Sequence, residues 1–281
     1  MRINWEERNP KAMYITKKTM IEYPFGHVQA TVYGPKRIGK TIYIMLGQMD
    51  AYKTIWPEKD YGYDIGWRFK KAMSNTIYTI KDMITKTEAL QKAYDNFEGG
   101  DTPKQYIKRS IEEGVPEILV QIDDGGVGFN KYLYFTDREI VQELKDYMDT
   151  VGIVISGVYI STPSLTGVLG FVREYEGYRI HITKRSDDFR RIAKVYKIIQ
   201  LPGGQMKPRR PKNDPYNTWL PSDLFREYKK KRGYYLRRNI RRLKEYQRKR
   251  KDKDELDDED LNDTIKSAEG IIREYKTDNI M

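Results

Sequence analysis

Short runs of β-branched and apolar residues alternate along the chain with longer stretches that have helical spacing. The short runs predict strands at residues 27–33, 117–122, 152–161 and 178–183. In the stretches between them, apolar residues recur at three- and four-residue steps, which predicts helices near residues 41–49, 67–96, 103–113 and 138–149. Strands that alternate with helices in this way are typical of an α/β fold with a mostly parallel central sheet.

The last third of the chain has a different pattern. Two strand-like segments, residues 190–200 and 205–210, flank Leu201-Pro202-Gly203-Gly204, and this arrangement predicts a β-hairpin rich in lysine and arginine. A basic helix with a loose apolar face is expected to begin at Ser222 or Asp223 and to end near Arg250. An acidic segment follows it.

These patterns predict the domain organisation. We expect an N-terminal arm, an α/β domain that includes the hairpin, a linker rich in Pro, Asn and Asp, and a helical C-terminal extension with an acidic tail. Their residues are 1–26, 27–207, 208–221 and 222–281. The arm is expected to be a short strand or irregular. The fold class expected for the domain is a three-layer α/β sandwich with a central mostly parallel sheet.

One loop in this pattern carries specific chemistry. The residues Gly34-Pro35-Lys36-Arg37-Ile38-Gly39-Lys40-Thr41 read G-x-x-x-x-G-K-[ST], the P-loop or Walker A pattern. A predicted strand precedes the loop and a predicted helix follows it, which is the setting that the motif requires. In such a loop, backbone N–H groups and the helix dipole hold phosphate oxygens, the lysine reaches the β- and γ-phosphates and the threonine hydroxyl holds Mg²⁺.

A second group of polar residues follows two later strands. The apolar run at 117–122 ends in Asp123-Asp124, a Walker B pattern, and the strand at 152–161 leads into Ser161-Thr162-Pro163. Ligands bind at the carboxyl ends of strands in α/β sheets, so we expect these side chains to lie beside the P-loop. Asp123 is the expected partner of Mg²⁺. We expect Thr162, with Ser161 as the alternative, to contact the water that attacks the phosphate.

Composition adds a partner to this picture. The chain has 281 residues, a formal net charge of +11 and no cysteine, and its basic residues are concentrated in the hairpin and the C-terminal helix. Such a charge favours a polyanionic partner such as DNA, although a thermophile-type surface is also rich in Lys, Arg and Glu. No apolar run reaches the length of a membrane span, so we expect a cytoplasmic protein that does not enter the membrane.

The P-loop and the paired aspartates together resemble the ASCE (additional-strand) division of P-loop ATPases. The loop Gly34–Thr41 is similar to the G-P-x-R-x-G-K-T loops of archaeal AAA+-type ATPases, and Ile122-Asp123-Asp124 resembles the Walker B segment of DnaA and of DnaC-like helicase loaders. The resemblance covers residues 27–185, and the chain looks like the ATPases carried by archaeal viruses and plasmids. It implies a homo-oligomeric ATPase that uses ATP and Mg²⁺, with Lys40, Asp124 and Thr162 as catalytic residues.

The resemblance implies a biological role and leaves alternatives open. It points to replication initiation or helicase loading on DNA. A hairpin stands where AAA+ proteins have a four-helix lid, which keeps an FtsK/HerA-like DNA translocation or packaging motor as the alternative. A GTPase needs [NT]-K-x-D, but in Thr183-Lys184-Arg185-Ser186-Asp187 the aspartate is one residue too late. A small-molecule kinase and a DNA-binding protein without hydrolysis remain as other classes.

Overall fold

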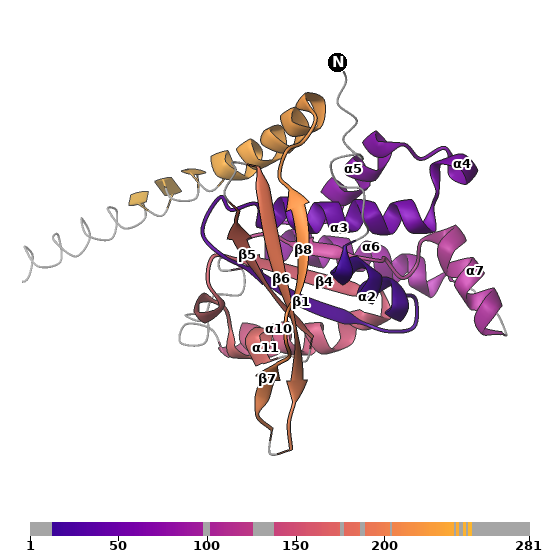
Figure 1. Ribbon diagram of the computed structural model, residues 1–281, viewed down its shortest axis with the longest axis horizontal. Coiled ribbons are helices and arrows are strands. Elements are labelled where there is room, and N and C mark those ends of the chain that lie inside the picture. Colours follow the sequence, from indigo (N-terminus) through magenta and orange to yellow (C-terminus); the bar gives the residue numbers. More distant parts are fainter. Residues whose placement is uncertain are drawn as a thin grey trace, which may run out of the picture. The chain divides into compact units, whose positions relative to one another are not determined.

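The computed structural model describes residues 13–97, 102–125, 138–174, 177–185, 189–202, 204–238, 240, 241, 244, 245, 247 and 248. The chain divides into two compact units, Met1–Leu224 and Phe225–Met281. The first unit contains the sheet and the helices labelled in Figure 1. In the second unit the described residues are helical, as the sequence predicts.

A mixed sheet, with parallel and antiparallel strands, forms the centre of the first unit. The strands are β1 (Val28–Tyr33), β2 (Thr76–Ile77), β3 (Val120–Ile122), β4 (Gly157–Thr162), β5 (Tyr178–Lys184), β6 (Arg190–Gln200), β7 (Met206–Pro208) and β8 (Lys212–Asn217). Their order is β2-β3-β4-β1-β5-β6-β7, and β8 pairs with β6 beside β7. Strands β1 to β5 run parallel, whereas β6 is antiparallel to β5 and both β7 and β8 are antiparallel to β6.

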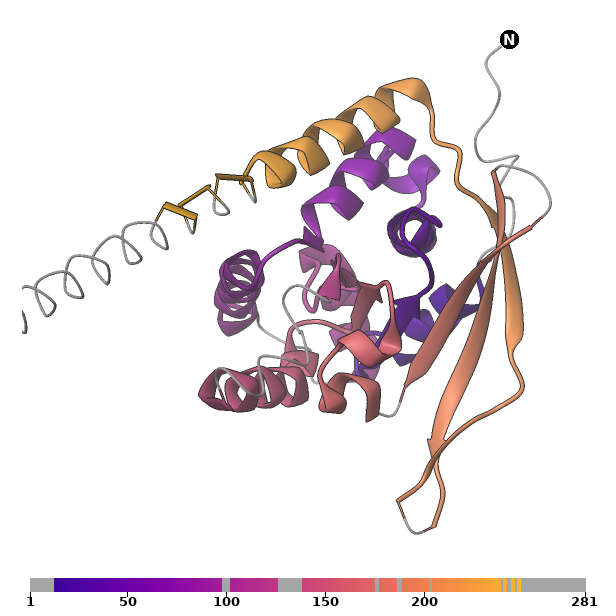
Figure 2. The ribbon, with the colours of Figure 1, turned by 90° about the vertical axis from the view of Figure 1, so that its left-hand side faces the viewer.

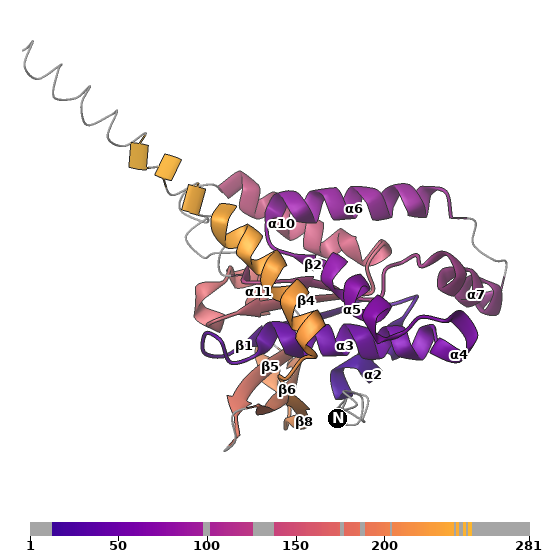
Figure 3. The same ribbon diagram turned by 90° about the horizontal axis from the view of Figure 1, so that it is seen from above.

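Helices cover both faces of the parallel part of this sheet. They are α2 (Tyr14–Glu22), α3 (Lys40–Ile55), α4 (Glu58–Tyr61), α5 (Ile65–Ser74), α6 (Ile80–Asp95), α7 (Pro103–Glu113), α10 (Arg138–Thr150) and α11 (Gly170–Glu174), with 3-10 turns η1 (Val151–Ile153) and η2 (Leu165–Gly167). Figure 3 shows α6 and α10 on one side of the strands, with α2 and α3 on the other. Met83 and Leu144 join Val120 and Val158 in the core on the α6 and α10 side. The expected three-layer fold is confirmed.

The stretch predicted as one helix at 67–96 is two helices with a strand between them. Helix α5 ends at Ser74, and Thr76–Ile77 pair in parallel with Gln121–Ile122 as strand β2. The side chain of Asn75, at the junction, is fully buried and donates a hydrogen bond to the Tyr52 hydroxyl at 2.7 Å. The three- and four-residue apolar spacing continues across this break, which is why the sequence pattern concealed it.

The described part of the N-terminal arm contains helix α2, which differs from the strand or irregular segment expected. Helix α2 has no capping side chain of its own at Met13. Its first N–H groups are satisfied by distant carboxylates: Met13 N donates to Asp50 at 3.0 Å, and Tyr14 N donates to Asp214 at 2.9 Å. A helix start that depends on partners from distant parts of the chain leaves no local sequence signal.

The predicted hairpin is present, but the chain after it is more ordered than a linker. The first residues of β6 pair with β8, and its last residues pair with β7. Strand β8, Lys212–Asn217, lies inside the segment 208–221, which the sequence predicts to be a linker. Figure 2 shows the β6–β7 end of this hairpin projecting beyond the other strands. Pro215 and the neighbouring polar residues are tolerated because β8 is an edge strand. Between β5 and residue 221 the described residues contain no helical lid.

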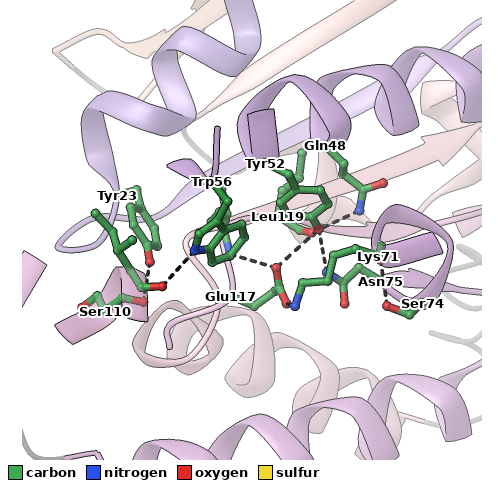
Figure 4. A network of polar contacts seen from close by, with 12 residues as sticks. Tyr23, Gln48, Tyr52, Trp56, Lys71, Ser74, Asn75, Ser110, Glu117 and Leu119 are labelled. Carbon is green, nitrogen blue, oxygen red and sulfur yellow. Dashed lines mark hydrogen bonds and ion pairs between the residues drawn. The ribbon is translucent and has the colours of Figure 1, made fainter. Parts of the chain in front are cut away.

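A buried polar network holds α3 and α5 against the start of β3. Glu117 is 1% exposed, and it accepts hydrogen bonds from Lys71 Nζ at 2.8 Å and from the Tyr52 hydroxyl at 3.4 Å (Figure 4). Gln48 Nε2 donates to the Leu119 carbonyl at 3.1 Å from the same face of α3. Buried charges of this kind require such partners. The network lies at the end of β3 opposite Asp123 and fixes the position of α3.

No helix among the described residues is long and apolar enough to cross a membrane.

We predict that Asp214→Ala destabilises the first unit by about 3 kcal/mol, because it leaves buried donors on α2 and the hydroxyl of Tyr43 without their acceptor. Denaturant unfolding followed by circular dichroism measures this change. Asp149→Ala, which removes an exposed carboxylate, is the control and should cost less than about 0.5 kcal/mol. Equal effects of the two substitutions would contradict the role assigned to Asp214.

Candidate functional site

The P-loop connects the carboxyl end of β1 to the start of α3 and uses backbone conformations that favour glycine. Gly34 has φ 146° and Gly39 has φ 104°. A Cβ atom at Gly34 would lie 2.9 Å from the Ile182 carbonyl oxygen, and one at Gly39 would lie 2.5 Å from Thr218 Cγ2. Both glycines are therefore required by conformation and by space. The turn that they allow brings the chain directly from the strand into the helix.

The beginning of α3 is built to receive an anion. Its N-cap is Gly39, which has no side chain that could accept hydrogen bonds from the first N–H groups of the helix. Helix dipole and N–H groups together favour phosphate at such an end. Lys40 Nζ donates hydrogen bonds to the carbonyls of Gly34 and Pro35 at 2.8 and 2.9 Å, so the ammonium lies at the mouth of the loop. Pro35, Lys36 and Arg37 are exposed, and Ile38 is half-buried.

The first aspartate of the Walker B pattern contacts the helix that follows the P-loop. Thr41 Oγ1 donates a hydrogen bond to Asp123 Oδ1 at 2.8 Å. Ser161 Oγ donates to the same oxygen at 2.8 Å and also accepts a hydrogen bond from the backbone N–H of Asp124 at 3.0 Å. Side chains from α3, from the residue after β3 and from β4 thus converge at the carboxyl ends of the central strands. The sequence predicts this for polar residues that follow strands.

The two aspartates have different surroundings. Asp123 is 4% exposed, whereas Asp124 is exposed and adopts φ 54°, an uncommon conformation for a residue other than glycine. This left-handed turn at Asp124 directs its backbone N–H to Ser161. Strained conformations of this kind occur at functional sites, where neighbouring contacts hold them. The side chain of Asp124 is left accessible at the end of β3.

The oxygens of Thr41 and Asp123 fit Mg²⁺. A hydroxyl and a carboxylate 2.8 Å apart supply the hard oxygen ligands that this ion prefers, and Mg²⁺ completes its shell with waters and substrate phosphates. Among the described residues there is no group of three or more His, Asp or Glu side chains that could hold a metal ion alone. A protein site with two oxygen ligands therefore suits an ion that arrives with a nucleotide.

Thr162 and Ser161 occupy different positions relative to the aspartates. Thr162 Oγ1 donates to the Ser164 carbonyl at 2.9 Å and belongs to the turn after β4, while Ser161 contacts Asp123. Adjacent strand residues point to opposite sides of a sheet, so one of the two faces the acid pair. The sequence identified both candidates but gave no register between β3 and β4 with which to choose. Ser161 is the residue that the geometry favours.

Three residues for which the sequence predicted no contact with the P-loop support it from the C-terminal strands; one of them, Arg191, was expected only as a basic residue of the hairpin. Arg191 Nε donates to the Ile38 carbonyl at 3.0 Å, the Tyr216 hydroxyl donates to the Gly39 carbonyl at 3.2 Å, and the methyl group of Thr218 packs against Gly39. Burial raises the pKa of Tyr216, and the nearby positive charge of Arg191 opposes this shift. Tyr216 therefore remains a neutral hydroxyl donor at physiological pH.

The fold and the site together define a class of protein. Strand β1, the P-loop and α3 have the strand–loop–helix arrangement of the P-loop NTPase fold, and β4 lies between β1 and the strand that leads to Asp123. No protein family model matches the chain.

One curated relative is an uncharacterized protein, B-251 of Sulfolobus spindle-shape virus 1. It is 25% identical over 229 residues, which cover 78% of this chain and 79% of the relative. Its name assigns no activity, but it places a similar sequence in an archaeal virus.

Three solved structures are similar to this chain at low identity. The N-terminal domain of zonular occludens toxin from Neisseria meningitidis is 13% identical, with a TM-score of 0.37, and covers 71% of this chain and 97% of its own. The genome packaging NTPase B204 of Sulfolobus turreted icosahedral virus 2, in complex with ATP-gammaS, is 11% identical, with a TM-score of 0.30 and coverage of 66% and 98%. A KaiC-like protein of Pyrococcus horikoshii OT3 is 12% identical, with a TM-score of 0.28 and coverage of 65% and 89%. Because these likenesses are distant, what the site can do is inferred from the geometry of this chain alone.

We predict that Gly39→Ala weakens binding of a nucleoside triphosphate by about 100-fold, because the new Cβ collides with Thr218 and φ 104° is strained for alanine. Fluorescence titration with a labelled ATP analogue measures the change. Gly62→Ala is the matched control, since Gly62 also has a positive φ (67°) but nothing lies within 4 Å of its added Cβ. Unchanged nucleotide affinity in Gly39→Ala would count against the P-loop as the binding site.

Proposed function

We propose that this protein is a Mg²⁺-dependent ATPase that acts on DNA as a homo-oligomer. The observation that carries the proposal is the contact between Thr41, directly after the P-loop lysine, and Asp123, at 2.8 Å. An ordinary glycine-rich turn would not require the hydroxyl of Thr41 to lie beside the carboxylate of Asp123. A site for a nucleotide with its magnesium ion does require a hydroxyl and a carboxylate next to the lysine.

The side chains have distinct roles in the proposed reaction, which transfers the γ-phosphoryl group to water. The loop N–H groups at Gly34–Thr41 bind the phosphates, and Lys40 turns from the carbonyls of Gly34 and Pro35 toward the β- and γ-oxygens. Thr41 and Asp123 would hold Mg²⁺, which would supply positive charge beside the phosphate oxygens. Asp124 orients the attacking water from its exposed position, and Ser161, which the geometry favours over Thr162, contacts that water from the end of β4.

The shorter carboxylate at position 124 bears on the rate. Aspartate reaches about 1.5 Å less far than glutamate, because it lacks one methylene group. The left-handed backbone at Asp124 changes the direction of its side chain, and we propose that this turn brings the carboxylate toward the γ-phosphate. Hydrolysis that depends on Asp124 would be slow in the resting protein and faster when a partner improves the geometry.

Basic side chains on the hairpin support DNA as the partner. Lys197, Lys207, Arg209 and Arg210 are exposed along β6, β7 and the residues that follow. A two-stranded β-ribbon can enter a DNA groove, and its lysines and arginines bind phosphates. Within the second unit, the helical residues 225–238 include seven further lysines and arginines: Arg226, Lys229, Lys230, Lys231, Arg232, Arg237 and Arg238.

The pathway that we favour is replication initiation or helicase loading in an archaeal virus or plasmid, as the resemblance of the P-loop and Walker B segments implies. An FtsK/HerA-like translocation or packaging motor is the alternative. The observation that favours the alternative is the antiparallel β6–β8 group, which occupies the chain after β5 where AAA+ proteins continue into a helical lid. Processive ATP-driven movement along duplex DNA would distinguish the motor from a loader.

We predict that Lys40→Ala lowers ATP turnover at least about 100-fold, because it removes the positive charge that stabilises the phosphates in the transition state. Phosphate release from ATP is measured with and without single- and double-stranded DNA, and oligomer size is recorded in the same samples. Lys36→Ala, which removes an exposed lysine of the same loop, should keep turnover within about threefold. Full activity in Lys40→Ala would rule out the proposed ATPase.

We predict that replacing Lys197, Lys207 and Arg209 by Gln reduces the slope of log K against log salt for duplex DNA by about 2.7, since each lost phosphate contact removes about 0.9. Fluorescence anisotropy over a range of salt concentrations measures the slope. The matched control replaces Lys104, Lys108 and Arg109, which are also exposed and lie on α7, and it removes the same net charge. If both triple variants change the slope equally, general charge and not the hairpin binds the DNA.

A further inference from the structure

The outer part of the sheet contacts the P-loop through side chains on two strands. Arg191 lies near the start of β6, and Tyr216 lies near the end of β8, and the two strands pair so that Arg191 is opposite Tyr216. Their polar groups reach the carbonyls of Ile38 and Gly39 at 3.0 and 3.2 Å. These two carbonyls belong to consecutive peptide groups at the end of the loop, immediately before Lys40.

A hydrogen bond to a carbonyl also fixes the N–H group of the same peptide. In a planar trans peptide the C=O and N–H bonds point in opposite directions. Because Arg191 holds the Ile38 carbonyl, the N–H of Gly39 is directed away from Arg191. Tyr216 and the N–H of Tyr43 both bind the Gly39 carbonyl, so the N–H of Lys40 points away from the helix and back toward the loop. Backbone N–H groups at the start of a helix are donors of the kind that a phosphate needs.

The packing around Arg191 and Tyr216 makes these contacts specific. Tyr216 is 5% exposed, and its ring lies 5.1 Å from that of Tyr43 on α3. Thr218, two residues beyond Tyr216, is held by hydrogen bonds from its N–H and its hydroxyl to the Phe189 carbonyl at 2.9 and 3.2 Å, and its methyl group packs against Gly39. Rotation of the Ile38 and Gly39 peptides is therefore opposed by side chains on two strands.

We propose that Arg191 and Tyr216 are positioning residues for the nucleotide: they hold the Ile38 and Gly39 peptides in the orientation that binds the triphosphate chain. The assignment deepens the proposed ATPase function and rests on it. The C-terminal strands are then part of the nucleotide site, although no residue of β6 or β8 belongs to a phosphate-binding motif. Both residues act through the loop backbone and not through the reacting atoms.

The experiment compares Arg191→Met, Tyr216→Phe and their combination in the full-length protein without DNA. ATP binding and steady-state hydrolysis are measured for each, along with the unfolding temperature without nucleotide. Arg191→Met should raise the Kd and the KM for ATP about tenfold, and Tyr216→Phe about threefold, because one removes a charged donor and the other a neutral one. The value of kcat should change by less than about threefold, since the same N–H groups bind the ground state and the transition state.

Two further variants test the specificity of the effect. Arg191→Lys retains a donor with a positive charge and should recover part of the affinity lost in Arg191→Met. Lys194→Met removes one positive charge from the opposite face of the same strand, where the burial pattern of β6 alternates, and should leave the KM for ATP unchanged. The double variant should weaken binding by less than the product of the single effects, because both residues fix adjacent peptides.

The outcomes separate this inference from the proposed function. If the wild-type protein binds ATP and Arg191→Met and Tyr216→Phe bind it equally well, the positioning role is wrong while the ATPase stands. A loss of affinity matched by a fall in unfolding temperature, without recovery in Arg191→Lys, shows a structural role only and overturns the inference. A fall in kcat at constant KM also overturns it, because Arg191 would then act in the transition state. Failure of the wild-type protein to bind ATP would remove the proposed function and this inference together.

Discussion

The hydrogen bond from Thr41 to Asp123 joins the two segments on which the site depends. Thr41 lies in the first turn of α3, directly after the P-loop, and Asp123 follows β3, which is separated from β1 by β4. The contact requires one particular position of α3 along the sheet. The buried network of Glu117, Tyr52 and Lys71, at the other end of β3, holds α3 in that position. The position of one hydroxyl thus depends on packing along the whole helix.

Segments whose conformation is set by local sequence could be predicted. The P-loop needs glycine at Gly34 and Gly39 because of φ values and close contacts, so its pattern is complete in the sequence. The N-cap of α7 is local as well: the sequence offers Asp101 or Thr102, and in the structure Thr102 and Gln105 form a reciprocal pair of hydrogen bonds. The strand ending in Asp123 is recognisable because a buried parallel strand is continuously apolar.

Features that depend on distant partners could not be predicted. Helix α2 begins where Asp50 and Asp214 supply acceptors, and Asp214 is 200 residues from Tyr14. The choice between Ser161 and Thr162 requires the register between β3 and β4, which no local pattern contains. Strand β8 resembles a linker in composition because an edge strand tolerates proline and polar residues on its solvent side. In each case a long-range contact overrode the local preference.

The two ends of strand β6 have different contacts, one with the P-loop and one with the basic hairpin. Its first residues pair with β8 and place Arg191 on the P-loop, whereas Ile198–Gln200 pair with β7 in the basic hairpin. Arg191 and Gln200 are nine residues apart, a rise of about 30 Å, so one continuous strand connects the proposed nucleotide and DNA contacts over that distance. Over Arg191–Val195 the strand is paired on both edges, with β5 and β8, so its peptides cannot rotate there without breaking these pairs, whereas Ile198–Gln200 are paired with β7 alone. A force on the hairpin would therefore reach the Ile38 peptide through a hydrogen-bonded element and not through a loop. This arrangement differs from a separate lid, because strand β6, which contacts the P-loop through Arg191, belongs to the same sheet as β1.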